Sequence, residues 1–291
     1  MRSALLSFLS LVLPAAAAAQ GMAPAPLSVH PLTPTVYWIE GGGGNSGVIV
    51  GEHSVIVIDA KMTPTGGRQL LDCIAAITPK PVTTVLLTHS DMDHVNGLAA
   101  FPAGVEIVAH ENAAKEMRAA IAANDPRAPP ADRLPTRILS ASDQTLVVDG
   151  ITLEVFHWAP AHTSGDLVVF LPKEKIVFAG DIETLNFPNP LIHLEKNGSS
   201  LGWIATARAM TALDADRFVP GHGDVQTREA LDARTTAATE KRLKIAELVA
   251  QGRSLDQIKA QLDPPAAQPP GVPRFPSYTE VVYRELTAPS H

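Results

Sequence analysis

An apolar and β-branched run at residues 82–87 is followed at once by the polar stretch Thr88-His89-Ser90-Asp91-Met92-Asp93-His94. The run has no strict alternation of apolar and polar positions, which predicts a strand buried on both faces. Open sheets with such strands bind ligands beyond the carboxyl ends of the strands. The polar stretch therefore stands where a ligand site is expected.

Strand and helix patterns alternate along the rest of the chain, which predicts an α/β layered protein. Expected strands cover residues 36–40, 47–51, 55–59, 105–109, 145–148, 152–156, 167–171 and 176–179. Expected helices cover residues 64–77, 95–100, 201–213 and 278–286, with Asn197 and Ser199 as cap candidates for the third. These patterns suggest two βαβ-like halves that face each other.

Four residues that can bind metal ions lie in the polar stretch, namely His89, Asp91, Asp93 and His94. In an extended turn, side chains two positions apart point the same way. His89 and Asp91 can therefore bind one ion while Asp93 and His94 bind a second. The alternative is a polar loop in which Asp93 caps the next helix and both histidines lie on the surface.

Three more residues of metal-binding type follow later strand-like runs: His162, Asp181 and His222. Each alone is an ordinary turn residue, since histidine and aspartate are common in solvated turns. Their occurrence in this order, after the first cluster, favours one shared site.

The order of these motifs resembles that of the metallo-β-lactamase superfamily. Its loop is written His-x-His-x-Asp-His and is followed by a histidine, a bridging aspartate and a last histidine. The similarity runs from about residue 36 to residue 224 and includes the glycine run at residues 41–44 and the strand ending in Asp59. It implies a four-layer αβ/βα sandwich with the metals at one edge.

The resemblance also implies a ligand set for two divalent metal ions, usually zinc in this family. The first site would comprise His89, Asp91 and His162, the second Asp93, His94 and His222, with Asp181 bridging both ions. Asp93 would also be catalytic, because the family assigns to this position the orientation of the hydroxide and proton transfer to the leaving group.

Asp91 departs from the family pattern, because most members have a histidine there. A carboxylate oxygen is a harder ligand than an imidazole nitrogen, so the metal-loop variant His-x-Asp-x-Asp-His also suits iron or manganese. Asp91 could instead be too short to reach, which would leave the second site dominant. The added negative charge would make the metal-activated water somewhat less acidic.

This resemblance implies a metallohydrolase in which a bridging hydroxide cleaves a cyclic amide, lactone, ester or thioester, with a β-lactam as one candidate. One alternative is a di-iron redox enzyme, since the flavodiiron branch has a carboxylate at the position of Asp91. The other is a metal-binding protein without catalytic activity. In the loop at residues 183–198, Asn186, His193 and Lys196 could bind substrate or be ordinary solvated side chains.

Composition limits the compartment and the partners. Residues 1–19 have the pattern of a signal peptide, so the rest of the chain, 20–291, is expected as one periplasmic or secreted domain without a membrane anchor. Its core would span about 36–227 and a C-terminal helical tail about 228–291. A net charge of −7 disfavours nucleic acid and favours a small-molecule substrate. The sequence leaves the oligomeric state open.

Overall fold

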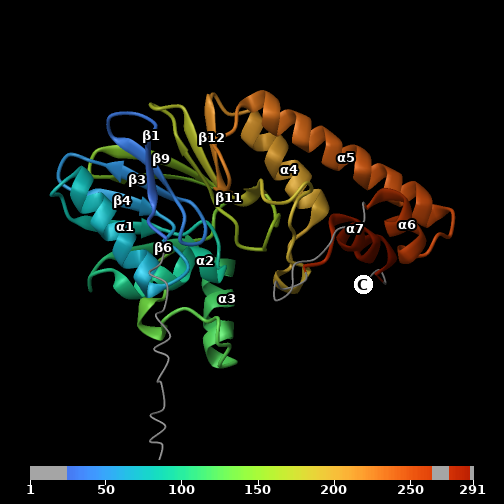
Figure 1. Cartoon of the computed structure of the whole chain (residues 1–291), viewed down its shortest axis with the longest axis horizontal. Helices are drawn as coiled ribbons and strands as arrows, with labels where there is room; N and C mark the ends of the chain where they lie inside the picture. The colour runs from blue at the N-terminus through green and yellow to red at the C-terminus, as the bar shows by residue number, and fades with distance from the viewer. Residues whose placement is uncertain (1–24, 264–274, 289–291) are drawn as a thin grey trace, which may run out of the picture.

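Two β-sheets, each with helices on its outer face, form the computed structural model, which describes residues 25–263 and 275–288 (Figure 1). The first sheet has the order β1 (Ser28–Pro31), β2 (Val36–Glu40), β3 (Ser46–Val50), β4 (Val55–Ile58), β5 (Val82–Leu86), β6 (Glu106–His110), β7 (Arg137–Leu139). The second has the order β12 (Arg217–His222), β11 (Ile176–Thr184), β10 (Val168–Leu171), β9 (Ile151–Phe156), β8 (Asp143–Val148). The predicted signal peptide lies outside the described residues.

Seven α-helices are present in the described part of the chain: α1 (Pro64–Ile77), α2 (Met92–Val95), α3 (Glu111–Ala122), α4 (Ser200–Thr211), α5 (Arg228–Ala250), α6 (Leu255–Leu262) and α7 (Tyr278–Thr287). The side chain of Ser199 caps α4 by accepting a hydrogen bond from the Gly202 amide, whereas Asn197 adopts a left-handed conformation just before it. None of the described helices has the length and hydropathy needed to span a bilayer.

Alternate residues of the central strands belong to different hydrophobic layers. Ile56 and Ile58 of β4 pack between the two sheets, whereas Val55 and Val57 pack in the layer that contains Leu70 of α1. A third layer joins the outer face of the second sheet to α4, α5 and α7. Burial on both faces explains the continuous apolar runs. The order helix, sheet, sheet, helix is the predicted αβ/βα sandwich.

The expectation of a βαβ-like second half was wrong. Strands β8 to β11 pair antiparallel, and only β11 and β12 pair parallel, so the second half is not a βαβ repeat. The connections between β8, β9, β10 and β11 contain no helix, so these neighbouring strands have no crossover that would let them run parallel. The short helix expected at residues 95–100 is present as a 3-10 helix over Asn96–Ala100, directly after α2, which includes Asp93 and His94. The N-cap position of α2 is Asp91, so Asp93 is not the cap.

Loops from both sheets meet at one edge of the sandwich. Strands β4, β5 and β6 are parallel, so their carboxyl ends lie together, and β12 ends beside β11 in the other sheet.

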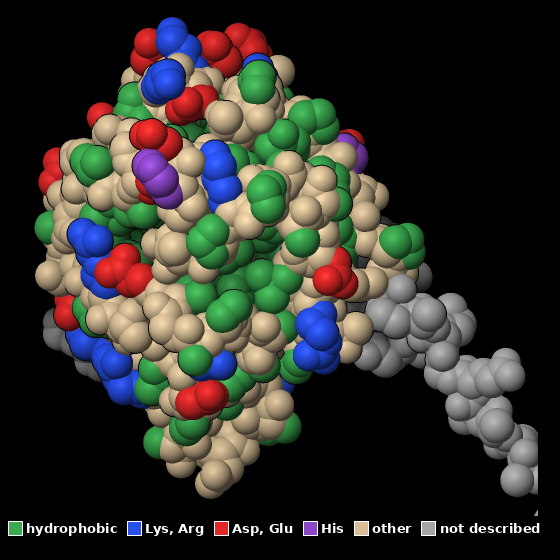
Figure 2. Space-filling model, turned by 90° about the vertical axis from the view of Figure 1, so that its left-hand side faces the viewer, with side chains coloured by type: hydrophobic (Ala, Val, Ile, Leu, Met, Phe, Trp, Pro, Cys, Tyr) green, Lys and Arg blue, Asp and Glu red, His purple; other side chains and the backbone are tan. Residues whose placement is uncertain are grey.

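The face of the molecule drawn in Figure 2 presents acidic and basic side chains interspersed with hydrophobic ones. Mixed charge of this kind creates no single-sign field for steering a polyanion toward that face. The absence of a nucleic-acid partner stays a prediction.

Lys61 is a buried lysine that holds the glycine-rich loop before β3. Its ammonium donates hydrogen bonds to the carbonyls of Ile39, at 2.6 Å, and Gly44, at 2.8 Å. Burial lowers the pKa of Lys61 to about 7, although the nearby charge of Asp59 acts in the opposite direction. The Gly44 amide in turn donates to the carbonyl of Asp93 at 3.1 Å. Lys61 therefore supports the backbone that lies against the metal loop.

Replacing Lys61 by methionine should lower the free energy of unfolding by about 1–3 kcal/mol, because buried carbonyl groups lose their donor. Urea denaturation of the wild type and the variant measures this change. Lys115→Met is the control, since the exposed ion pair of Lys115 with Glu111 should contribute less than about 1 kcal/mol. Equal losses in both variants would contradict a supporting role for Lys61.

Candidate metal centre

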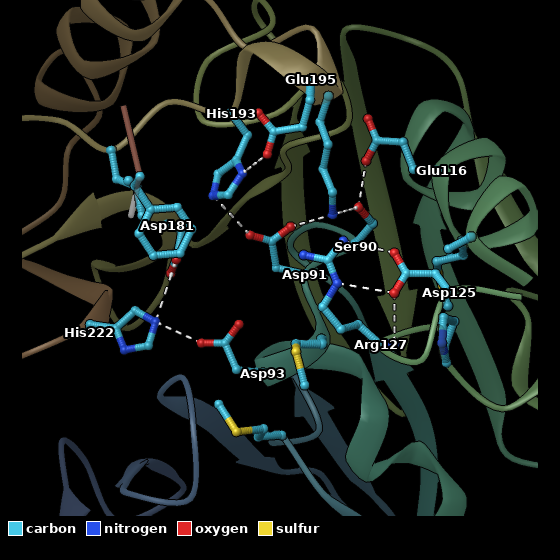
Figure 3. Close-up of a pocket in the computed structure, with 18 of the residues that line it drawn as sticks. Ser90, Asp91, Asp93, Glu116, Asp125, Arg127, Asp181, His193, Glu195 and His222 are labelled. Carbon is cyan, nitrogen blue, oxygen red and sulfur yellow. Dashed lines mark hydrogen bonds and ion pairs between the residues drawn. The ribbon is translucent and has the colours of Figure 1, made fainter. Parts of the chain in front are cut away.

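The seven residues predicted from the sequence come together at the shared edge of the two sheets. His89 and Asp91 follow β5, Asp93 and His94 lie in α2, His162 follows β9, Asp181 lies in β11, and His222 ends β12. Figure 3 shows Asp91, Asp93, Asp181 and His222 around one pocket. Their placement agrees with a common site, while their roles as ligands stay a prediction.

The side chains form two groups whose possible ligand atoms lie within 4.8 Å of one another. In the first group, Asp91 Oδ2 lies 3.1 Å from His162 Nε2 and 3.7 Å from His89 Nε2. In the second, Asp93 Oδ2 lies 3.0 Å from His222 Nε2 and 3.8 Å from His94 Nε2. The two groups have the membership that the sequence predicted.

Asp181 lies between the two groups. Its Oδ1 is 3.1 Å from His94 Nε2, and its Oδ2 is 3.5 Å from His222 Nε2 and 3.8 Å from His162 Nε2. One carboxylate thus faces nitrogens of both groups, which is the position required of a bridging ligand.

Hydrogen bonds of the imidazole rings indicate that this cluster fits cations. The Nδ1 atoms of His94 and His162 contact acceptors, Asp59 Oδ2 at 2.8 Å and the Leu191 carbonyl at 2.9 Å. Their Nε2 atoms then carry lone pairs that face carboxylate oxygens. His89 Nε2, His94 Nε2 and Asp181 Oδ1 are buried without a hydrogen-bond partner. Electron pairs that converge in this way need protons or metal ions between them.

The carboxylates also create a field that favours positive charge on the imidazoles. Burial lowers the pKa of His162, but its hydrogen bond with Asp91 and the charge of Asp91 raise the pKa to about 9. Burial likewise opposes protonation of His222, and the charge of Asp181 raises its pKa to about 9. A field that favours a proton at these nitrogens also favours a metal cation there.

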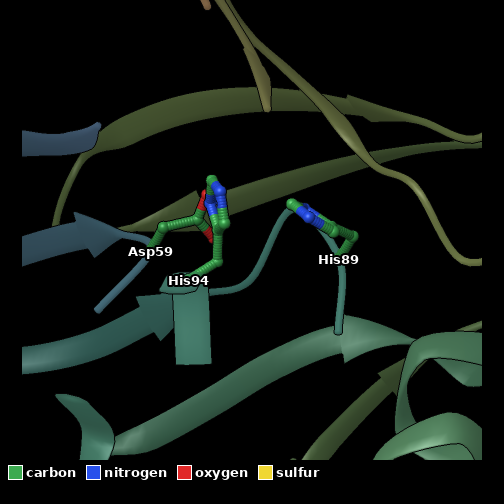
Figure 4. Close-up of side chains that lie close together, drawn as sticks. All are labelled: Asp59, His89 and His94. Atoms are coloured by element: carbon green, nitrogen blue, oxygen red, sulfur yellow. The ribbon is translucent and has the colours of Figure 1, made fainter. Parts of the chain in front are cut away.

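Asp59 orients His94 rather than joining the ligands, although the three side chains Asp59, His89 and His94 lie close together (Figure 4). Its oxygens accept hydrogen bonds from the Thr88 amide at 2.8 Å, the Thr88 hydroxyl at 2.7 Å and His94 Nδ1 at 2.8 Å. The Thr88 oxygen in turn lies 2.9 Å from His89 Nδ1. One carboxylate therefore fixes two imidazoles. The sequence showed Asp59 only as a strand end.

Two glycines allow the backbone to approach the cluster. A Cβ atom on Gly44 would lie 2.2 Å from the His94 ring, and one on Gly221 would lie 1.8 Å from Asp181 Oδ1. Asn45 ties the same loops together, because its Nδ2 donates to the carbonyls of Pro220, at 3.0 Å, and Gly223, at 2.9 Å. The sequence Gly-Gly-Asn and the glycines around His222 are thus explained by close packing.

The pocket is lined by the three residues of the loop at 183–198 whose role the sequence left open: Asn186, His193 and Lys196. Lys196 Nζ contacts Asp91 Oδ1 and donates to Ser90 Oγ at 2.9 Å. His193 Nε2 lies 3.5 Å from Asp91 Oδ2, and its Nδ1 lies 2.5 Å from Glu195 Oε1. The solvated-loop interpretation is therefore wrong for Lys196 and His193. Local sequence patterns could not predict these contacts, because more than 100 residues separate Lys196 from Asp91.

A cavity of about 440 Å³ opens onto the cluster. Asp91, Asp93, Asp181 and His222 belong to its lining. Half of the sixteen other lining residues are apolar, namely Met62, Met92, Met117, Ala120, Pro129, Phe187, Leu191 and Phe275. A volume of this size, lined by apolar side chains next to polar groups, is typical of small-molecule sites.

Comparison with known proteins agrees with this fold. The model of the metallo-beta-lactamase superfamily matches residues 39–222. The chain therefore belongs to the metallo-beta-lactamase superfamily, a group of metal-dependent hydrolases. Its cluster of histidines and aspartates suits divalent metal ions, whose identity and number stay predictions.

Two curated relatives show how varied similar proteins are. The chain is 28% identical to the alpha subunit of 2,4-dinitroanisole O-demethylase from Nocardioides sp. (strain JS1661), over 67% of this chain and 57% of that subunit. It is 24% identical to a metallo-beta-lactamase type 2 from Bacteroides fragilis, over 67% of this chain and 76% of that enzyme. The match thus spans little more than half of the demethylase subunit.

Solved structures share the fold. The stereoselective inverting sec-alkylsulfatase Pisa1 from Pseudomonas sp. matches with a TM-score of 0.71 at 17% identity, over 90% of this chain and 50% of that one. A metallo-beta-lactamase from Pontibacter korlensis matches with a TM-score of 0.62 at 22% identity, over 73% of this chain and 99% of that one. These similarities concern the fold and not the substrate.

Asp59→Asn should weaken zinc binding by about 10- to 100-fold, the usual effect of losing a partner that orients a ligand. Competition with a chromophoric chelator measures the affinity. Asp149→Asn is a matched control, because Asp149 accepts similar bonds from the backbone, hydroxyl and imidazole groups of His53 and Ser54, away from the cluster. Zinc binding by Asp59→Asn at wild-type strength would show that Asp59 does not orient His94 for a metal.

Proposed function

We propose that this protein is an exported hydrolase that uses two divalent metal ions, zinc in the first instance, to cleave a small, neutral and largely apolar ester or lactone. The observation that carries the proposal is the cavity whose apolar side chains, Phe187 and Phe275 among them, lie next to the carboxylate and imidazole cluster. Apolar walls stabilise an uncharged substrate by burial, at about 25 cal/mol per Å² of apolar surface. The cluster is then positioned beside the bond to be broken.

Charge in the cavity supports a neutral substrate over an anionic one. One arginine and one lysine line the described cavity, and each already contacts a carboxylate. Arg127 donates to Asp125 at 3.0 and 2.8 Å, and Lys196 contacts Asp91. A substrate carboxylate would have to compete with these internal partners. Glu116 and Glu195 add further acidic groups to the lining.

The chemistry divides between the metals and the protein. When bound, two divalent ions lower the pKa of water toward neutrality and polarise the carbonyl to be attacked, so no serine or cysteine nucleophile is required. His89, Asp91 and His162 would hold one ion, Asp93, His94 and His222 the other, and Asp181 both. The apolar lining orients the substrate and excludes bulk water from the reacting bond.

Asp93 is the residue proposed to move the proton. It lines the cavity with a half-buried carboxylate whose Oδ2 lies 3.0 Å from His222 Nε2. Burial raises the pKa of Asp93, but the positive charge favoured on His94 and the hydrogen bond with His222 lower it by more. The net effect is a pKa below the ordinary value of an aspartate. Asp93 is therefore an anion at neutral pH. It can accept a proton from the attacking water and return it to the leaving group.

A β-lactam substrate is the nearest competing proposal, since a relative from Bacteroides fragilis is named a metallo-beta-lactamase. The ion pairs of Arg127 with Asp125 and of Lys196 with Asp91 disfavour it, because β-lactams carry a carboxylate that needs a cation.

The di-iron redox proposal rests on the oxygen ligand Asp91, and elemental analysis showing iron in place of zinc would support it. A purely metal-binding role is disfavoured by the complete set of seven residues.

Export is proposed from the signal-like residues 1–19. Fractionation of cells that express the full chain, with N-terminal sequencing of the product, tests it. A periplasmic or secreted product beginning near residue 20 is expected.

The substrate class is tested with zinc-loaded mature protein on a 4-nitrophenyl alkanoate, an apolar lactone and a chromogenic cephalosporin. We expect metal-dependent hydrolysis of the ester or lactone, with kcat/KM at least tenfold above that for the cephalosporin. A chelated sample and Asp181→Ala should both be inactive. Preference for the cephalosporin would make the protein a β-lactamase instead. If metal-replete protein hydrolyses none of the three compounds, the proposed substrate class is rejected.

Asp93→Asn should lower kcat by on the order of 100-fold or more and leave KM nearly unchanged, as expected for loss of a proton-transfer group. Steady-state kinetics on the best ester measures both constants. Zinc content is measured on the same samples, because Asp93 is also a proposed ligand. Unchanged kcat in a variant with full zinc content would remove Asp93 from the mechanism.

A further inference from the structure

His193 is held firmly against the first group of ligands, although it lies in a long loop after β11. Its amide donates to the His162 carbonyl at 2.8 Å, and its own carbonyl accepts from the amides of Lys196, at 3.0 Å, and Gly198, at 2.9 Å. Its side chain is 10% exposed. The rings of His162 and Phe275 pack edge-on against it, with centroids at 4.7 and 5.3 Å. A solvated side chain would have none of these restraints.

Three imidazoles face one oxygen in this part of the structure. Around Asp91 Oδ2, the Nε2 atoms of His162, His193 and His89 lie at 3.1, 3.5 and 3.7 Å. Figure 3 shows His193 directed toward Asp91 from the side opposite Ser90. These nitrogens surround a carboxylate oxygen that can itself bind an ion, and imidazole nitrogen is a donor that zinc prefers in a first coordination shell. His193 is not part of the group of ligand atoms that lie within 4.8 Å of one another, so its ring would move toward an ion bound beside this oxygen.

Each of these imidazoles is also held at its other nitrogen. His89 Nδ1 lies 2.9 Å from Thr88 Oγ1, and His162 Nδ1 lies 2.9 Å from the Leu191 carbonyl. His193 Nδ1 lies 2.5 Å from Glu195 Oε1. Metal-binding histidines typically donate this second N–H to a carboxylate or carbonyl, which leaves Nε2 free for the ion. His193 with Glu195 has that arrangement.

We propose that His193 is a nitrogen ligand of the first metal site and supplies the third imidazole that position 91 lacks. Asp91 cannot provide a nitrogen, and its Oδ1 is already bound by Lys196. A loop from the other sheet instead brings an imidazole to the oxygen that Asp91 directs into the site. The first site would then comprise His89, His162 and His193, with Asp91 Oδ2 as an additional oxygen donor. This inference rests on the metal centre of the proposed function.

The first test is metal binding by His193→Ala. Zinc stoichiometry by elemental analysis should fall from two to one per chain after dialysis. First-site affinity should fall by more than roughly 100-fold, beyond the range seen when only an orienting partner is lost. His53→Ala, which removes an exposed histidine far from the cluster, should keep both ions. Two zinc ions bound by His193→Ala at wild-type affinity would overturn the proposal.

A compensating change makes the test specific to the missing imidazole. Asp91→His restores the loop pattern of most of the family, so Asp91→His combined with His193→Ala should regain the second zinc ion. If His193 only contacted substrate, His193→Ala would raise KM and keep both zinc ions, and the combined variant would show no rescue. That result would also overturn the proposal.

A measurement on the wild type covers the case in which His193→Ala does not fold. In cobalt-substituted protein labelled with ¹⁵N-histidine, paramagnetically shifted resonances should come from five imidazoles, those of His89, His94, His162, His193 and His222. Four shifted imidazoles would reject His193 as a ligand. Wild-type protein that binds no metal at all would instead reject the proposed function, so the two failures are distinguishable.

Discussion

The central constraint on this structure is the burial of carboxylates next to imidazoles. Asp91, Asp93 and Asp181 each have an oxygen within 3.0–3.5 Å of an imidazole nitrogen of one cluster, and anions gathered around one cluster repel one another where water is scarce. The arrangement is stable only if positive charge lies between them. The lone pairs of the surrounding Nε2 atoms define where that charge can be. Much of the local architecture holds these groups in place against their mutual repulsion.

The supports of the cluster come from far along the chain. Asp59 at the end of β4 orients His94, and Lys61 two residues later fixes the loop that contains Gly44. Both residues have positive φ angles, 60° and 77°, so the chain accepts an unfavourable backbone conformation just where β4 ends. Strain of this kind persists only where surrounding contacts enforce it. Here the contacts are the same hydrogen bonds that position the site.

Local patterns predicted the elements of the fold well, because burial on both faces leaves a clear record in the sequence. The strand before His89 and helix α1 both agree with expectation to within one residue. The antiparallel order of β8 to β11 was not predicted, since strand direction depends on loop length and pairing rather than on apolar pattern. The two groups of candidate ligands were predicted only through resemblance to a family, because no local rule relates His162 to Asp91.

The contacts of His193 and Lys196 escaped prediction for the same physical reason. Each residue is ordinary in its own loop, and its importance arises only when that loop lies over Asp91. Exchanging an imidazole for a carboxylate at one position adds negative charge and removes a nitrogen donor. Lys196 offsets the charge, and His193 stands where the nitrogen is missing. The exchange at position 91 is thus matched by two side chains from the opposite sheet. Because Lys196 is occupied in this way, it is withdrawn from substrate binding, which links the altered metal loop to the preference proposed for a neutral substrate.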